Sequence, residues 1–552
     1  MQLRNYQNYA VDALFTYFGE KSGNPLVVMP TGTGKSLVIG DFCRKAVKQY
    51  PSTHILMLTH VKELISQNYD KLLKIWPTAP AGIYSAGLGQ KDTYMPITFG
   101  GVASIIKTDL KQFGRVDLLI IDEAHLVSSK EDTMYGEIIK KLKEINPYLK
   151  VIGLTATDYR SGHGRLTSGV HIFTDVAVDM SKRESFNWFI SEGYLVPLIP
   201  KRPSVEVDLS KVKIKLGEYD AKESQAAFDK REITYRACRE LVQTATATNR
   251  NHWLIFASGV EHTEHVAEML ESMDISVTYV HSKMAKGTRD KNIEDFKAGK
   301  YTAMVNNGIL TTGFDFPEMD LIGMLRATLS TNLWVQMLGR GTRPVFESGF
   351  DLETKAGRLA SIAASAKQNC LVLDFAGNTR RLGPINDPVI PEAKSKGKVG
   401  DAPVKICDAC MCYNHASVRF CEQCGHEFPR YYKIKDVASS DELIAENEVD
   451  KKEIFNVDRV VYKDHVRTGK IPSLKVTYYC GLRSFTEYIC LEHGDSYAGK
   501  VARDWWRFSA NDHIIPYTIM DAMTKLDKLR KPKRIKVDLN DERPRIVDYE
   551  YG

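Results

Sequence analysis

A glycine-rich segment at residues 30–36 has the residue types needed to hold a polyphosphate. Glycines let the backbone approach an anion closely, and the N–H groups at the start of the following helix point toward it. Lys35 can reach the β- and γ-phosphates, and the Ser36 hydroxyl can bind Mg²⁺. A full loop of this kind has a further glycine where this chain has Met29, so a glycine-rich turn without a ligand is the alternative. The expected nucleotide contacts are Thr31, Gly32, Thr33, Gly34, Lys35 and Ser36.

A second segment, at residues 122–125, can supply a metal ligand and a base. It follows the apolar run 118–121, which predicts a buried strand whose end presents carboxylates at the ligand-binding edge of a parallel sheet. Asp122 is expected to act through water on Mg²⁺, and Glu123 to orient and deprotonate the attacking water. His125 either couples this site to a second domain or forms a hydrogen bond within the core. The two segments together predict a nucleotide hydrolase.

Short apolar runs alternate with helical stretches in two successive parts of the chain, which predicts parallel sheets and an α/β fold. The runs of the first part are 26–29, 55–58, 118–121 and 151–154. Those of the second part are 253–256, 277–280, 303–306, 321–324 and 370–373.

Length and composition limit the class of protein. A chain of 552 residues is too long for one core, so roughly three or four domains are expected. The net charge of +6 permits a nucleic-acid partner without arguing for one, and 10 cysteines in such a chain do not indicate a disulfide scaffold. There is no signal peptide, and no apolar run approaches the ~20 residues of a membrane span, so we expect a soluble intracellular protein.

Further segments resemble, in order, the motifs of superfamily-two helicases of the DEAD/DEAH type. They are residues 3–7 (the adenine-reading motif), 59–64 (the first nucleic-acid motif), 155–157 (the motif linking hydrolysis to domain movement), 255–258 (the fourth motif), 311–315 (the fifth) and 336–343 (the sixth).

This resemblance implies roles for individual residues. Gln7 is the implied adenine contact, with Arg4 beside it, and Gly313 and Asp315 join the nucleotide-binding set. The implied nucleic-acid contacts are His60, Lys62 and Thr311, and the implied catalytic residues of the sixth motif are Gln336, Arg340 and Arg343. An arginine pair stabilises charge on γ-phosphate oxygens in the transition state. If the pair comes from the second domain, hydrolysis requires the two domains to close.

Nearly the whole chain also resembles the bacterial RadD family of DNA-repair helicase-like ATPases, through residues 60–64, 310–315 and 373–378. The resemblance implies two tandem RecA-like parallel-sheet domains, followed by a small zinc ribbon and a C-terminal α/β domain. It implies ATP, Mg²⁺ and Zn²⁺ as cofactors, and single-stranded, forked or branched DNA as the partner, with no membrane. RadD-like proteins are associated with single-stranded-DNA-binding protein, which makes that protein a candidate partner. The expected location is the cytoplasm of a bacterial or phage-infected cell.

The predicted division of the chain has six parts. They are an ATP-binding domain at 1–185, a connecting segment at 186–235, a helicase C-terminal domain at 236–380, a linker at 381–405, a zinc-binding module at 406–430, and an accessory domain at 431–552 as a candidate nucleic-acid binder.

Four cysteines form two closely spaced pairs, each with the spacing of a zinc knuckle. The predicted zinc ligands are Cys407, Cys410, Cys421 and Cys424. Four thiolates leave no open coordination position, so the metal is expected to be structural. The alternatives are a redox-labile disulfide set, or a ligand drawn from Cys412, His415 and His426.

The C-terminal part contains a basic run and an aromatic cluster, each with two interpretations. The run (Lys525, Lys528, Arg530, Lys531, Lys533, Arg534, Lys536) either neutralises phosphates or forms a solvated face. Trp505, Trp506 and Phe508 either stack on bases or belong to a core, and we expect a core role for at least two of them.

The sequence therefore predicts an ATP-dependent DNA motor: a helicase, a translocase or a remodeller of branched DNA. Because such cores grip mainly the sugar-phosphate backbone, an RNA helicase of the DExH kind is the alternative. A non-catalytic nucleic-acid scaffold with a relic ATP site is the alternative of another class.

Overall fold

The computed structural model describes residues 2–127, 133–160, 164–168, 172–215, 217–311, 313–390, 402–428, 452–466, 471–481, 483–494, 496–511, 514–539 and 544–551. The chain divides into two compact units, Met1–Tyr431 and Tyr432–Gly552. Of the predicted linker, 391–401 lie outside the described residues, as does Thr312 of the fifth motif.

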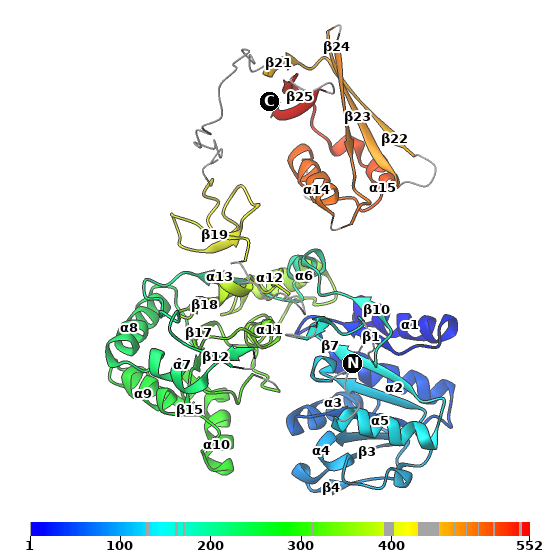
Figure 1. Cartoon of the computed structure of the whole chain (residues 1–552), viewed down its shortest axis with the longest axis vertical. Helices are drawn as coiled ribbons and strands as arrows, with labels where there is room; N and C mark the ends of the chain where they lie inside the picture. Colours follow the sequence, from blue (N-terminus) through cyan, green and yellow to red (C-terminus); the bar gives the residue numbers. More distant parts are fainter. Residues whose placement is uncertain are drawn as a thin grey trace, which may run out of the picture. The chain divides into compact units, whose positions relative to one another are not determined.

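The first unit begins with an eight-stranded sheet in which seven strands run parallel and β4 pairs antiparallel with β3 (Figure 1). Every strand predicted for this part of the chain is present, and the sheet order places β6 between β7 and β2. The strands, in spatial order, are β10 (Asp175–Asp179), β1 (Pro25–Val28), β7 (Lys150–Thr155), β6 (Leu118–Asp122), β2 (Ile55–Thr59), β5 (Ile97–Gly101), β3 (Ala81–Ser85) and β4 (Gln90–Lys91).

Helices cover both faces of this sheet because alternate strand residues point to opposite sides. Met57 and Ile120 pack in the core under α1, α2 and α3, whereas Leu58 and Ile121 pack under α4 and α5. Both faces are apolar, so the strands appear in the sequence as continuous apolar runs. The helices are α1 (Asn5–Glu20), α2 (Lys35–Gln49), α3 (Lys62–Ile75), α4 (Val102–Ile105) and α5 (Met134–Ile145).

A second sheet of six parallel strands forms the next lobe of the same unit (Figure 1). It contains all five strands predicted there, and β11 is added at its edge by pairing with β18. Thus the segment predicted as a connection, 186–235, contributes a strand and helix α7 to this domain. The strands, in spatial order, are β11 (Leu198–Lys201), β18 (Cys370–Asp374), β17 (Leu321–Leu325), β14 (Trp253–Ala257), β16 (Ala303–Asn306) and β15 (Val277–Val280).

The helices of this lobe also pack on two faces. Phe228 and Leu241 belong to the core on one side, and Phe296 and Trp334 to the core on the other. The helices are α7 (Ala221–Phe228), α8 (Arg231–Ala247), α9 (Val260–Glu271), α10 (Lys286–Lys297), α11 (Thr331–Leu338), α12 (Lys355–Ala364) and α13 (Asn378–Leu382). The two lobes also contain helix α6 (Arg183–Ser191) and two short strand pairs. The pairs are β8 (Tyr159–Arg160) with β9 (Gly164–Arg165), and β12 (Ile214–Lys215) with β13 (Glu218–Tyr219).

The cysteine module is a small antiparallel ribbon, β19 (Val404–Ile406) and β20 (Tyr413–His415). It is attached to the second sheet through β11, because the Arg202 N–H donates to the Met411 carbonyl at 2.8 Å and Cys412 packs in the core of that domain. The ribbon is therefore part of the first unit.

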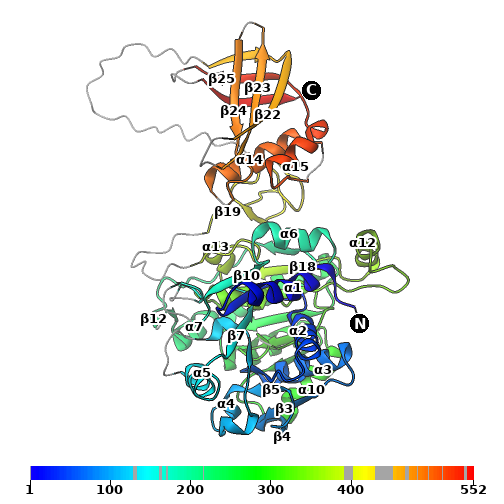
Figure 2. The same ribbon diagram turned by 90° about the vertical axis from the view of Figure 1, so that its right-hand side faces the viewer.

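In its described residues, the second unit has two antiparallel sheets and two α-helices that share one core (Figure 2). One sheet has the order β21-β25-β26 and the other β22-β23-β24. The elements are β21 (Lys452–Asn456), β22 (Arg459–His465), β23 (Ser473–Cys480), β24 (Arg483–Ile489), α14 (Tyr497–Ser509), α15 (Ile519–Thr524), β25 (Pro532–Asp538) and β26 (Arg545–Tyr551).

The core role expected for two of the three aromatic residues of α14 is confirmed. Trp505 and Trp506 pack in the core, whereas Phe508 is 40% exposed. The basic run has local acidic partners: Lys525 contacts Asp521 at 2.9 Å, and Arg534 contacts Glu550 at 2.6 Å. These contacts favour a solvated face over a phosphate-binding one.

Among the described residues, no helix combines the length and the apolar character needed to cross a lipid bilayer.

Replacing Trp506 by alanine should destabilise the second unit by about 3–5 kcal/mol, because a fully buried aromatic side chain leaves a cavity. Hydrogen exchange at α14 in the full-length protein measures this loss. Phe508→Ala, two positions along the same helix, is the control and should cost less than about 1 kcal/mol. Equal losses in the two variants would show that Trp506 is not a core residue.

Candidate active site and metal centre

The glycine-rich loop joins the end of β1 to the start of α2 at the edge of the first sheet. Gly32 and Gly34 have φ of +88° and +85°, a conformation that side chains other than glycine rarely adopt. A Cβ atom at Gly34 would lie 2.5 Å from Nε2 of Gln7. Glycine is therefore required here both by the turn and by the close approach of α1.

Two side chains of α1 donate hydrogen bonds to this loop. The Gln7 amide donates to the Thr33 carbonyl at 2.9 Å, and the Tyr6 hydroxyl donates to the same carbonyl at 3.0 Å. The Arg4 N–H donates to Oε1 of Gln7 at 3.0 Å, and the Arg4 guanidinium lies 4.7 Å from the ring centre of Tyr194. The predicted adenine-reading residues thus lie beside the loop, and Tyr6 and Tyr194 are additions that the sequence pattern did not single out.

Lys35 and the two acids come together at this sheet edge. The Lys35 ammonium donates to the Met29 carbonyl at 3.1 Å, inside its own loop. Asp122 ends β6 and is buried; it accepts hydrogen bonds from Asn68 Nδ2 and from the Glu123 N–H, both at 3.0 Å. Burial lowers the pKa of Lys35, while the charges of Glu123 and Asp122 raise it. The charges of the lysine and the acids therefore act on one another in a single cleft.

Burial also affects Asp122. Together with the charge of neighbouring Glu123, it raises the pKa of Asp122 to about 6. Glu123 has a φ of +55°, an uncommon conformation for a residue with a side chain, and its buried Oε2 has no hydrogen-bond partner among the described residues. An unpaired buried oxygen next to the phosphate loop fits a role in holding a water molecule or a proton.

His125 lies in a short turn after Glu123 and contacts both lobes of the unit. Its Nε2 accepts a hydrogen bond from Gln336 Nε2 of α11 at 2.9 Å, so its Nδ1 is the protonated nitrogen and donates to Thr155 Oγ1 at 3.0 Å. Burial lowers the pKa of His125 to about 4, so the ring is neutral, and its 3.4 Å approach to Glu123 Oε2 is not an ion pair. Of the two roles predicted for His125, this geometry favours coupling between domains.

Asn332 makes a second connection across the same interface. Its amide donates to Thr157 Oγ1 and to the Tyr159 carbonyl, both at 2.8 Å. Thr157 belongs to the predicted motif that links hydrolysis to domain movement. The sequence interpretation missed Asn332. The signal that could have identified it is its position one helical turn before Gln336, on the same face of a mostly apolar helix.

The two arginines of the sixth motif lie in the second lobe and face the phosphate loop. Arg340 is buried and donates to the Thr311 carbonyl at 2.7 Å and the Phe314 carbonyl at 2.7 Å. Arg343 donates to the Asp315 carboxylate at 2.5 Å. A Cβ atom built on Gly32 would lie 3.2 Å from Cγ of Arg343, which shows how closely the two lobes approach. Burial lowers the pKa of Arg340 to about 10, so it remains charged at neutral pH.

The arrangement fits a nucleoside triphosphate with Mg²⁺. The cleft contains three cationic side chains, two acids and a loop whose left-handed glycines expose its N–H groups. Ser36 and Asp122 are the residues that would hold the metal, and Lys35, Arg340 and Arg343 match the negative charge of the phosphates.

The predicted nucleic-acid contacts are distributed over both lobes. His60 is exposed, with its ring centre 5.0 Å from that of Tyr135, and the Lys62 ammonium lies 3.4 Å from Glu63. Thr311 is buried, and its carbonyl is the acceptor of Arg340. Gln67, which the sequence interpretation did not single out, donates to the Gly313 carbonyl across the interface at 2.7 Å.

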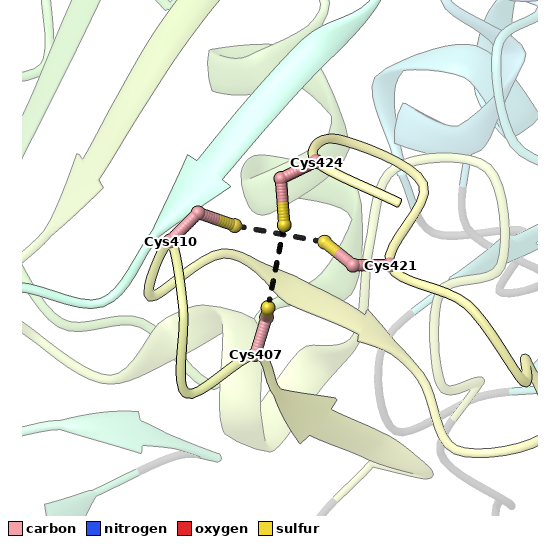
Figure 3. A group of neighbouring side chains, drawn as sticks. All are labelled: Cys407, Cys410, Cys421 and Cys424. Atoms are coloured by element: carbon pink, nitrogen blue, oxygen red, sulfur yellow. Dashed lines mark hydrogen bonds between the residues drawn. The ribbon is translucent and has the colours of Figure 1, made fainter. Parts of the chain in front are cut away.

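The four predicted zinc ligands converge on one point (Figure 3). All four sulfur atoms lie within 4.8 Å of one another, and the Cys407–Cys424 and Cys410–Cys421 sulfur pairs are 3.6 Å apart. Four sulfurs at about 2.3 Å from one Zn²⁺ would be about 3.8 Å apart, so the cluster has the dimensions of a tetrahedral site. Cys412 lies outside this group, as expected.

Backbone and side-chain donors favour negative charge on one of these sulfurs. Burial raises the pKa of the Cys421 thiol, but hydrogen bonds from the backbone of Cys424 and Gln423 and from Asn414 outweigh it and lower that pKa to about 6. Asn414 Nδ2 lies 3.4 Å from this sulfur, and its Oδ1 accepts the Glu422 N–H at 2.8 Å. The donor set therefore fits a thiolate-bound metal.

Two sequence families match this chain, one on each lobe. Residues 1–160 match the family described as "Type III restriction enzyme, res subunit", and residues 234–344 match the family described as "Helicase conserved C-terminal domain". The first match contains the phosphate loop and both acids, and the second contains both arginines.

Whole-chain comparisons agree with these matches. The chain is 28% identical over 402 residues to irc3 of Schizosaccharomyces pombe, named as a mitochondrial ATP-dependent helicase, covering 71% of this chain and 60% of the relative. It is 25% identical over 417 residues to the 51.5 kDa protein of Lactococcus phage (isolate 7-9), covering 73% of this chain and 78% of the relative. The chain thus spans about 60% of the length of the yeast relative.

A solved structure supports the fold. The fragment described as an HsdR subunit of a type I restriction enzyme from Vibrio vulnificus YJ016 has a TM-score of 0.50 at 18% identity, covering 69% of this chain and 66% of that chain.

Purified protein should contain about one Zn²⁺ per chain, and Cys421→Ser should remove it because a three-sulfur site binds the ion much more weakly. Elemental analysis by mass spectrometry measures the metal content. Cys412→Ser is the matched control, since Cys412 is a buried cysteine beside the cluster but outside it. Wild-type protein that is purified without chelators and lacks zinc would contradict the assignment.

Proposed function

We propose that this chain, which has the two-domain core of a superfamily-two helicase, is a DNA-dependent ATPase. It acts as a helicase, a translocase or a remodeller of branched DNA in repair, recombination or replication. The observation that supports this best is the split active site: Lys35, Asp122 and Glu123 lie in one domain, while Arg340 and Arg343 lie in the other. Hydrolysis in such a site depends on how the two domains meet.

The first domain prepares the attack on the γ-phosphate. Lys35 leaves the Met29 carbonyl to contact the phosphates, and Glu123 orients a water molecule and accepts its proton through the unpaired Oε2. Ser36 and Asp122 would hold Mg²⁺, which would supply positive charge to the phosphates. The adenine is recognised by Gln7 with Arg4 beside it, next to the loop that Gln7 supports.

The second domain completes the site. Arg343 is paired with Asp315, and the γ-phosphate competes with that carboxylate for the guanidinium when the cleft closes. Arg340 fixes the loop that contains Thr311 and Phe314. Because the carbonyl of Thr311 accepts two hydrogen bonds from Arg340, a DNA strand that contacts Thr311 changes the position of a catalytic arginine through those bonds.

The remaining parts of the proposal rest on the RadD resemblance. The zinc ribbon is a structural module fixed to the second domain, and the C-terminal unit is an accessory domain. The partners are single-stranded, forked or branched DNA and single-stranded-DNA-binding protein, in the cytoplasm of a bacterial or phage-infected cell. The name of the irc3 relative, an ATP-dependent helicase, supports the motor function.

Lys35→Ala and Glu123→Gln should each lower the kcat of ATP hydrolysis by about 10²–10⁴-fold, the first through lost charge neutralisation and the second through loss of the base. Glu123→Gln should still bind ATP, since the amide keeps the size of the carboxylate. Phosphate release measures turnover, and Glu137→Gln, an exposed acid of the same domain, is the control. Unchanged phosphate release from Lys35→Ala would show that this loop is not the catalytic site.

Single-stranded or forked DNA should stimulate ATP hydrolysis more than RNA of the same sequence. In the double variant His60→Ala/Lys62→Ala, the DNA concentration for half-maximal stimulation should rise, because these residues are the proposed contacts of the first nucleic-acid motif. Stronger stimulation by RNA would favour the RNA helicase alternative, and hydrolysis indifferent to every nucleic acid would reject both.

A further inference from the structure

A lysine outside all the helicase motifs is buried beside Arg343 in the second domain. Lys367 lies between α12 and β18, and its side chain is 1% exposed, among the largest fully buried side chains of the described residues. Its own backbone is held in place, because the Lys367 N–H donates to Ser365 Oγ at 3.2 Å and that hydroxyl contacts the Lys367 carbonyl at 3.1 Å.

The ammonium of Lys367 joins the loop at the end of the fifth motif to the sixth motif. Its Nζ donates to the carbonyl of Pro317 at 2.6 Å and to the carbonyl of Arg343 at 2.7 Å. The same two segments are already joined by the Arg343 guanidinium, which pairs with Asp315. Arg343 is therefore linked to the 314–317 loop in two ways. Its side chain pairs with Asp315, and its backbone carbonyl is connected to the loop through Lys367.

Burying this charge is costly, which argues against a role in filling space. A buried ammonium loses several kcal/mol of hydration, whereas an apolar chain of similar length would occupy the same volume without that loss. The apolar chain would, however, leave the carbonyls of Pro317 and Arg343 without their donor. The charge of Lys367 therefore has a local effect: its hydrogen bond fixes the position of the Arg343 backbone.

We propose that Lys367 is a positioning residue for phosphoryl transfer, which fixes the backbone of Arg343 so that its guanidinium reaches the γ-phosphate when the cleft closes. This inference rests on the proposed function, in which Arg343 stabilises the transition state. An arginine whose backbone shifts by a fraction of an ångström points its guanidinium elsewhere, and such misplacement of a catalytic group lowers the rate strongly.

The charge of Lys367 depends on pH in the accessible range. Burial lowers the pKa of Lys367 to about 8; of the groups that face it, Cys370, Asp320 and Glu318 raise that pKa and Arg343 lowers it. The ammonium is charged below this pKa and neutral above it, and a neutral amine makes weaker hydrogen bonds to the two carbonyls. The kcat of the wild-type protein should therefore fall as pH rises through about 8.

A double-mutant cycle tests the proposal. Lys367→Met should lower the DNA-stimulated kcat by about tenfold or more, with unchanged affinity for a fluorescent ATP analogue, because Lys367 does not touch the nucleotide-binding loop. In the Arg343→Ala background, Lys367→Met should cause no further loss, since it acts through the missing guanidinium. Lys300→Met, an exposed lysine of the same domain that pairs with Asp295, is the control.

The outcomes separate this inference from the function on which it rests. If Arg343→Ala leaves kcat unchanged, the proposed function of Arg343 fails. Two outcomes overturn only the positioning role. In the first, Arg343→Ala lowers kcat but Lys367→Met does not. In the second, Lys367→Met lowers kcat by the same factor in the wild-type protein and in Arg343→Ala.

Should Lys367→Met not fold, the pH profile provides the second test. Lys367→Arg keeps a charge at every pH used and should lose the step near pH 8 that the wild-type protein shows. A wild-type profile without that step, or a step that persists in Lys367→Arg, would overturn the proposal.

Discussion

The meeting of five charged side chains, all buried or half-buried, in one cleft is the constraint on which the rest of this structure depends. Lys35, Asp122 and Glu123 come from the first lobe, and Arg340 and Arg343 from the second. Each charge is costly to bury alone, and the costs are offset only when the opposite charges share the cleft. The cations contact backbone carbonyls and Asp315, which are partners that phosphates can replace.

Hydrogen bonds from polar side chains link the two domains. The hydrogen bond from Gln336 to His125 and the pair that Asn332 donates join the helix of the sixth motif to the loops that follow β6 and β7. Because His125 is neutral, these bonds form and break without moving a charge through the interface.

Two modules extend the core in different ways. The cysteine ribbon pairs with the edge strand of the second sheet and shares its core through Cys412, so metal binding would stiffen that edge. The C-terminal unit has its own core, which contains Trp506, and acids of α15 and β26 contact Lys525 and Arg534 of the basic run. Whether a basic run is available to bind phosphates thus depends on the acidic side chains that the fold places beside it.

The sequence by itself determined four strands of the first sheet, five of the second, the phosphate loop, the two acids, the arginine pair and the four cysteines, because each is encoded by residues close together in the chain. It did not predict strands β3, β4, β5 and β10 of the first sheet or β11 of the second. Nor did it predict the roles of Asn68, Gln67 and Asn332, whose partners lie more than 50 residues away along the chain. Lys367 is the clearest case, since in the sequence it is one lysine among many. Only the tertiary structure places its ammonium on the carbonyls of Pro317 and Arg343, because hydrogen-bond partners distant in sequence are brought together by packing and not by pattern.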